Sequence, residues 1–141
     1  MKIAIGSDHG GFTLKKVVLA LLQELEHDIN DVGCHNLDSV DYPNFADLVS
    51  EQVVKGEADL GILICGTGIG MSMAANKHQG IRAALCSEQY TASMSREHND
   101  ANILCMGERV TGPGVAEEIV RTWLSTPFGG GRHQRRIELF S

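Results

Sequence analysis

Residues 62–70 read Ile-Leu-Ile-Cys-Gly-Thr-Gly-Ile-Gly, a short apolar run that ends in three alternating glycines with a cysteine at the junction. Such a run is typical of a buried strand, and residues 71–76 after it are typical of a helix. Glycines at this turn let bare backbone N–H groups approach a ligand oxygen. We therefore expect an anion, or a charge that develops during a reaction, to be stabilised there, with Cys65 as a base or nucleophile. The alternative is a turn that needs glycine only for shape, with Cys65 as a small core residue.

Strand and helix patterns alternate from this stretch to both ends of the chain. Apolar segments predict five strands, at residues 2–6, 28–32, 60–64, 81–85 and 102–105. Helix patterns lie between them, with Ser87 as the expected cap of the fourth helix and Gly112-Pro113 at the start of the fifth. This alternation predicts an α/β fold: a doubly wound, five-stranded parallel sheet with helices on both faces, in three layers. Ligands then bind at the carboxyl ends of the strands.

Composition predicts a single domain over residues 1–141. The chain is 43% hydrophobic and contains no apolar run near the ~20 residues that a membrane span needs, so no membrane partner is expected. A strand pattern begins at Lys2 without a signal or transit peptide, which predicts a cytoplasmic protein. The net charge of −6 argues against a nucleic-acid partner. Four cysteines without a Cys-x-x-Cys pair indicate free thiols, and neither a zinc site nor a disulfide framework.

Three strand ends carry chemically complementary side chains. The first predicted strand ends at Asp8 and His9, the third at Cys65 and Thr67, and the fifth leads to Arg109. Because the carboxyl ends of parallel strands share one edge of the sheet, we expect these residues to converge. Acid–base groups, a thiolate, a hydroxyl and a fixed positive charge would then meet in one site. Two further cysteines close strands without a glycine turn and are predicted to be core residues, Cys86 and Cys105.

Two polar clusters follow in the second half of the chain, where all the arginines lie. His98 and Asn99 precede the fifth strand, where a histidine titrates near neutral pH and an amide can bind a hydroxyl; a capped turn is the alternative. In the tail, residues 126–141, Arg132 and Arg136 share one face of a short predicted helix, with His133 adjacent. We predict a phosphate clamp there, with a solvated basic tail as the alternative.

In their order along the chain, these motifs resemble one family, the B-type ribose-5-phosphate isomerases, which are grouped with the galactose-6-phosphate isomerase subunits. The matching segments cover essentially the whole chain: residues 6–12, 41–43, 65–70, 74–77, 80–83, 95–102 and 130–133. The resemblance implies a Rossmann-like homodimer, or a tetramer, with active sites at the subunit interface. It implies an aldose–ketose isomerase of the pentose phosphate pathway that acts on a phosphorylated sugar without a metal or organic cofactor.

The resemblance also implies a role for each matching residue. Cys65 is the base that moves a proton between C2 and C1, and Thr67 with the backbone amides of Gly66, Gly68 and Gly70 stabilises the enediolate oxygen. Asp8 and His98 open the furanose ring, and Asn99 holds a sugar oxygen. The implied phosphate-binding residues are His9, Arg109, Arg132, His133 and Arg136.

Two details of the resemblance concern the mechanism and the interface. One branch of the family uses a glutamate at the position of Met71, a role that methionine cannot fill, so the Cys65 mechanism is the consistent one. In the implied interface, Cys65 and Thr67 of one subunit meet three residues of the other, namely His98, Asn99 and Arg109.

Two alternative functions stay open at this point. An isomerase of a six-carbon sugar phosphate, such as allose 6-phosphate or galactose 6-phosphate, differs in pocket length by one carbon, which is worth only ~1–3 kcal/mol of discrimination. A non-catalytic phosphosugar- or nucleotide-binding module is the other alternative. Such a module has no use for a thiolate together with Asp8 and His98.

Overall fold

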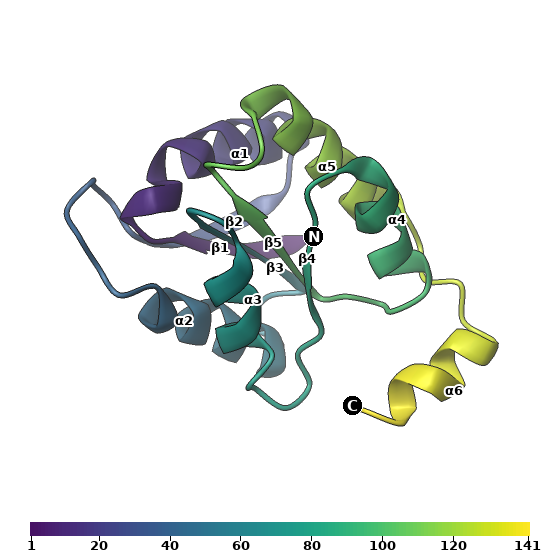
Figure 1. The fold of residues 1–141 in the computed structure, drawn as a ribbon. Helices are drawn as coiled ribbons and strands as arrows, with labels where there is room; N and C mark the ends of the chain where they lie inside the picture. The colour runs from purple at the N-terminus through teal and green to yellow at the C-terminus, as the bar shows by residue number, and fades with distance from the viewer.

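A computed structural model describes all residues of the chain, 1–141. Its five strands form one parallel sheet in the order β2-β1-β3-β5-β4. The strands are β1 (Lys2–Ser7), β2 (Asp28–Gly33), β3 (Leu60–Cys65), β4 (Ala83–Leu85) and β5 (Ile103–Gly107). Figure 1 shows the sheet between two layers of helices, which confirms the predicted three-layer α/β fold.

The helices divide between the two faces of the sheet (Figure 1). One face is covered by α1 (Phe12–Glu24), α4 (Gln89–Glu97) and α5 (Pro113–Ser125), and the other by α2 (Tyr42–Val54) and α3 (Ile69–Ala75). A short 3-10 helix, η1 (His9–Gly11), connects β1 to α1. The last helix, α6 (Arg132–Glu138), lies apart from both layers near the C-terminus. None of these helices has both the length and the apolar character of a membrane span.

Both faces of the sheet are buried, and this explains the continuous apolar strands of the sequence. Along β3, Ile62 and Ile64 point into a core cluster with α1 and α5, whereas Leu63 points into a second cluster with α2 and α3. All three side chains are fully buried. Burial of each such side chain contributes ~1.5–3 kcal/mol to the stability of the fold relative to an exposed one. The alternation of side chains between the two clusters therefore holds helices against both faces of the sheet.

The strand order creates a switch point between β1 and β3. After β1 the chain forms β2 on one side, and it then crosses to form β3 on the other side of β1. The connections therefore leave in opposite directions and open a crevice at the carboxyl ends of these two strands. Strand β5 lies on the far side of β3, with Gly107 in register with Cys65. The predicted convergence of three strand ends on one edge is confirmed.

The start of α4 differs from the prediction. Ser87 is not the cap; Glu88 occupies that position, and its carboxylate accepts hydrogen bonds from the Thr91 amide at 3.0 and 3.2 Å. An N-cap side chain must lie directly before the first helical residue, which here is Gln89. The hydrogen bonds from Thr91 lower the pKa of Glu88.

Strand β4 is shorter than predicted. It begins at Ala83, because the two preceding residues, Ile81 and Arg82, lie in a connecting loop that the Asn102 side chain holds in place. The Oδ1 atom of Asn102 accepts a hydrogen bond from the backbone N–H of Arg82 at 2.8 Å, and its Nδ2 atom donates to the Gly80 carbonyl at 2.8 Å. Strand β5 in turn extends to Gly107, beyond the predicted end at Cys105.

Candidate active site

Cys65 ends β3 in the switch-point crevice and is 6% exposed. Its Sγ accepts a hydrogen bond from the Gly68 amide at 3.1 Å. An N–H group directed at the sulfur stabilises negative charge there. Gly68 has a left-handed backbone with φ 82°, and a Cβ at this position would lie 2.5 Å from the Leu85 side chain and 2.9 Å from the Met106 backbone. The turn therefore needs glycine both for its conformation and for space.

The glycine turn also leaves several backbone donors free. The amides of Gly66, Thr67 and Gly70 donate to no other group of the chain, whereas the Gly68 amide is directed at Cys65 and the Ile69 amide donates to the Thr67 hydroxyl at 3.2 Å. Two of the three predicted oxyanion donors are thus available, and the third supports the thiol instead. Free N–H groups in such a turn form a concavity that suits a negatively charged oxygen.

Asp8 and His9 stand beside this turn, at the end of β1. The buried Asp8 carboxylate accepts a hydrogen bond from the Gly11 amide at 3.2 Å. A Cβ built on Gly10 would lie 3.3 Å from both the Asp8 Oδ1 and the Gly66 nitrogen, so the carboxylate and the free amide are near neighbours. The Nδ1 atom of His9 faces the Val40 amide at 3.2 Å as an acceptor, which places the proton of a neutral ring on Nε2.

Arg109 completes this edge of the sheet. Its guanidinium carbon lies 3.6 Å from the position of a Cβ on Gly66, and its backbone N–H donates to the Gly66 carbonyl at 3.0 Å. The side chain is exposed at the mouth of the crevice. The implied interface grouped Arg109 with His98 and Asn99 of the other subunit. The structure instead has Arg109 next to Cys65 in the same chain, because Gly107 and Cys65 are in register.

Sequence reasoning missed two contributors to this half of the site. A Cβ on Gly107 would lie 2.4 Å from the Thr67 carbonyl carbon, so the absence of a side chain in β5 lets the glycine turn pack on the strand. Tyr42, the first residue of α2, packs beside Gly70, where a Cβ would lie 2.6 Å from its ring. The signals available were the glycine at the end of β5 and the Asp41-Tyr42-Pro43 motif.

His98 and Asn99 lie at the opposite edge of the sheet. Helix α4 runs back from the end of β4, so its C-cap residue, His98, precedes the start of β5. In the β3–β5 register, Ile103 pairs with Gly61 whereas Gly107 pairs with Cys65. Four residues of strand separate these pairs by about 13 Å. A single chain therefore does not bring His98 and Asn99 to the Cys65 thiol.

The tail helix joins the His98 side of the molecule. The rings of His98 and His133 are stacked, with centroids 4.2 Å apart and planes at 14°. The Gly129 N–H donates to the Glu97 carbonyl at 2.9 Å, and Ile137 is the buried residue of α6. Partial burial lowers the pKa of His133, and the nearby charges of His98 and the arginines Arg132 and Arg136 lower it further.

The predicted phosphate-binding residues are thus divided between the two edges. His9 and Arg109 lie with Cys65, whereas His133 lies against His98, with Arg132 and Arg136 exposed on α6. A cavity of about 420 Å³ adjoins Asn99 and Phe140, not Cys65. No group of three His, Cys, Asp or Glu side chains is placed to hold a metal ion. Cys86 and Cys105 are packed in the core as predicted, and burial raises the pKa of both thiols.

Comparison with known proteins identifies the family. Residues 3–140 match the model of a family described as Ribose/Galactose Isomerase. The chain is 51% identical over 137 residues to ribose-5-phosphate isomerase B of Escherichia coli, a match that covers 97% of this chain and 92% of that protein.

Solved structures agree with this assignment. Ribose-5-phosphate isomerase B of Clostridium thermocellum has a TM-score of 0.98 at 55% identity, covering 99% of this chain and 94% of that one. The enzyme of Mycoplasma genitalium, solved with bound ribulose-5-phosphate, has a TM-score of 0.95 at 46% identity, covering 98% and 92%. This chain therefore belongs to the ribose/galactose isomerase family.

Proposed function

We propose that this chain is an aldose–ketose isomerase that interconverts D-ribose 5-phosphate and D-ribulose 5-phosphate through an enediolate, in the pentose phosphate pathway. Membership of the isomerase family and 51% identity to ribose-5-phosphate isomerase B of Escherichia coli support this reading. The observation that carries it is the Cys65 sulfur, held by a backbone N–H in a turn with free amide donors and the Asp8 carboxylate nearby.

The proposed chemistry uses that arrangement directly. Cys65, as a thiolate, takes a proton from the carbon next to the carbonyl and returns it to the neighbouring carbon. The charge that develops on the enediolate oxygen is stabilised by the free amides of the glycine turn and by the Thr67 hydroxyl. These donors are fixed by the packing of the turn on β5, so they need no rearrangement during the reaction. Asp8, with His98 and Asn99, serves the opening of the sugar ring.

We propose that the working site is assembled from two copies of the chain. The two sets of predicted residues lie at opposite edges of one sheet, and a two-fold axis between copies brings each edge against the other twice. Apolar side chains beside the Cys65 turn are exposed, including Ile69 (47%), Met73 (66%) and Leu85 (43%), and so are Leu139 (79%) and Phe140 (63%) in the tail. Burial of these side chains favours association, as a homodimer or as a tetramer of such dimers.

The phosphate group of the substrate is proposed to lie between the two copies. His9 and Arg109 reach it from the chain that supplies Cys65, and α6 of the other chain supplies Arg132, His133 and Arg136. Planar guanidinium groups bind phosphate oxygens through paired hydrogen bonds. A cytoplasmic location keeps the four unpaired thiols reduced.

Turnover measured side by side on ribose 5-phosphate, allose 6-phosphate and galactose 6-phosphate tests the substrate assignment. We expect the highest kcat/KM with ribose 5-phosphate. A higher value with either six-carbon substrate would identify a six-carbon isomerase. Binding of all three sugars without turnover would identify a binding module. The Cys65→Ala variant, run in parallel, excludes a contaminating isomerase.

A further inference from the structure

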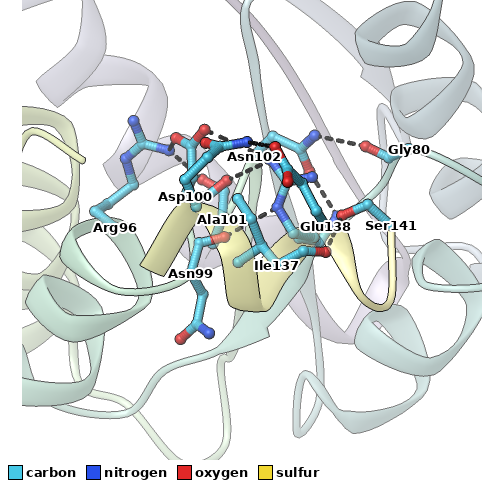
Figure 2. Close-up of polar contacts among 11 residues, drawn as sticks. Gly80, Arg96, Asn99, Asp100, Ala101, Asn102, Ile137, Glu138 and Ser141 are labelled. Carbon is cyan, nitrogen blue, oxygen red and sulfur yellow. Dashed lines mark hydrogen bonds and ion pairs between the residues drawn. The ribbon is translucent and has the colours of Figure 1, made fainter. Parts of the chain in front are cut away.

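Two arginines and one aspartate form a cluster in and around the loop that follows His98 and Asn99. Figure 2 shows Arg96 beside Asp100 in this cluster. Arg96 of α4 contacts the Asp100 carboxylate at 3.0 Å, and Arg82 contacts its other oxygen at 3.6 Å. The arginine side chains are only 19% and 15% exposed for Arg82 and Arg96. The proposed chemistry leaves all three residues unused.

The same two arginines bind the backbone of the loop that follows α4. Arg82 donates from Nε to the Asn99 carbonyl at 2.9 Å and from Nη2 to the Asp100 carbonyl at 3.0 Å. Arg96 donates from Nη1 to the Ala101 carbonyl at 2.5 Å. Three consecutive carbonyl groups are thus held by guanidinium donors. Hydrogen bonds from charged donors are stronger than those between neutral groups, so this backbone has little freedom.

Asp100 adopts an unusual backbone conformation within this cluster. Its φ of 45° is left-handed, which aspartate and asparagine tolerate better than other side chains. The sharp change of direction at Asp100 ends the helical path and starts the approach to β5. Figure 2 shows the Asn99 amide pointing away from the bonded cluster. The loop held by these hydrogen bonds is the backbone from which Asn99 projects, directly after His98 at the end of α4.

The cluster is anchored to rigid parts of the fold. The Arg96 guanidinium lies 5.6 Å from the ring centroid of Trp123, which is fully buried on α5. On the other side, the Asn102 side chain binds the backbone of Arg82 and Gly80, as described above. The loop is thereby fastened to α5 and to the edge of the sheet.

We propose that Asp100, bridged by Arg82 and Arg96, positions His98 and Asn99 for opening of the sugar ring. The inference rests on the proposed function, because it assumes that these two residues act on a cyclic sugar phosphate. Reactive groups must be held to well under 1 Å, and a displacement of about 1 Å costs ~10²-fold in rate. Asp100, Arg82 and Arg96 are positioning residues that act through their neighbours.

The ratio of hydrogen exchange to isomerisation provides a readout that a merely structural role would not alter. Ribose 5-phosphate is mostly a furanose and must be opened before its proton is moved. Ribulose 5-phosphate is an open chain, because the oxygen that would close a five-membered ring onto its C2 carbonyl carries the phosphate. Exchange of a C1 hydrogen of ribulose 5-phosphate with solvent deuterium needs the base and the enediolate, but no opening or closure of a ring. Misplaced ring-opening groups therefore slow net isomerisation, by the same factor in both directions because the equilibrium constant is fixed, far more than they slow this exchange.

The test variant is Asp100→Asn, which removes the charge but keeps the shape and the tolerance of a left-handed backbone. We expect kcat/KM to fall by about 10- to 100-fold with ribose 5-phosphate. For the exchange of a C1 hydrogen of ribulose 5-phosphate with solvent in D2O, followed by NMR, we expect a loss of no more than about twofold, the usual limit for independent effects. The control is Asp47→Asn, which removes a different carboxylate, paired with His78 at 2.8 Å, and should change neither value.

Equal losses of isomerisation and of C1 exchange, or no loss of either, would overturn the positioning role while leaving the isomerase assignment intact. Absence of turnover by the unmodified protein in both directions would instead overturn the proposed function, and the positioning role with it. If circular dichroism shows that Asp100→Asn is unfolded, Arg82→Lys decides the matter with the same pair of measurements. Lysine keeps the charge but has a single nitrogen, which cannot replace both the Nε and the Nη2 donors that bind the Asn99 and Asp100 carbonyls.

Discussion

The two halves of the proposed site are held in place by different means. At Cys65, backbone packing holds the site in place: the turn packs on β5 so closely that a Cβ on Gly107 would lie 2.4 Å from Thr67. At His98, side chains hold the site in place, through a ring stack with His133 and the hydrogen bonds of two arginines. The first half therefore tolerates no added bulk, whereas the second is sensitive to charge and to the docking of the tail.

The largest expected effect is on the Cys65 half. Cys65→Ala removes the proposed base and should lower kcat by ~10²–10⁴, with little change in the binding of a substrate analogue. Steady-state kinetics and calorimetric titration measure the two quantities. The matched control is Cys86→Ala, which removes another buried thiol and should affect stability at most. Near-normal turnover by Cys65→Ala would contradict the assignment of the base.

Mixing two inactive variants tests whether the halves come from different copies. If they do, a heterodimer of Cys65→Ala and His98→Ala chains has one site with both lesions and one with neither. After joint denaturation and refolding in equal amounts, half of the dimers are mixed, and about a quarter of all sites should work. Native mass spectrometry confirms that heterodimers form. No gain in activity over the separate variants would show that each chain builds its own site.

A smaller effect is expected in the tail. Arg136→Ala removes charge-assisted hydrogen bonds to the phosphate, each worth ~1.5–3 kcal/mol, so KM should rise by about 10- to 100-fold with little change in kcat. Arg135→Ala is the matched control, since it removes the same charge from the same helix outside the predicted clamp. Unchanged inhibition of Arg136→Ala by inorganic phosphate would show that the clamp is assigned to the wrong residues.

The smallest effect concerns the pH dependence of stability. Because the pKa of His133 lies below its ordinary value in the folded protein, the folded state binds fewer protons than the unfolded state in the window just below pH 6.5. Stability contributed by the neutral ring is present above this window and is lost as the pH falls through the lowered pKa. His133→Gln should therefore lose less thermal stability on acidification than the unmodified protein, as measured by Tm. The control is the same comparison above about pH 8, where the His133 ring is neutral in both states and the Tm difference between the two proteins should be constant.

The same contrast explains what could be predicted from the sequence. The strands were predictable because both faces of the sheet are buried, so runs such as Ile62, Leu63 and Ile64 are apolar without interruption. The Cys65 turn was predictable because its determinants are local: one thiol and closely spaced glycines. The position of β5 between β3 and β4 was not, because strand order depends on contacts between distant segments.

The His98 half was harder to predict for a physical reason. Its residues were identified one by one, but the stack of His98 on His133 depends on where a glycine-rich connection lets α6 lie. No periodicity in the sequence specifies that path. The N-cap of α4 was predicted one residue too early, because Ser87 and Glu88 are neighbours and both can accept a hydrogen bond from a helix N-terminus.

Strand β5 is synthesised late in the chain, and this has a consequence for the newly made polypeptide. Strand β3 is synthesised well before the neighbour on its far side, so the sheet stays open along one side of β3 until residues 103–107 have left the ribosome. Until then the turn after Cys65 lacks the Gly107 backbone on which it rests. The Cys65 thiol is therefore least protected from oxidants during synthesis, and its burial depends on the last third of the polypeptide.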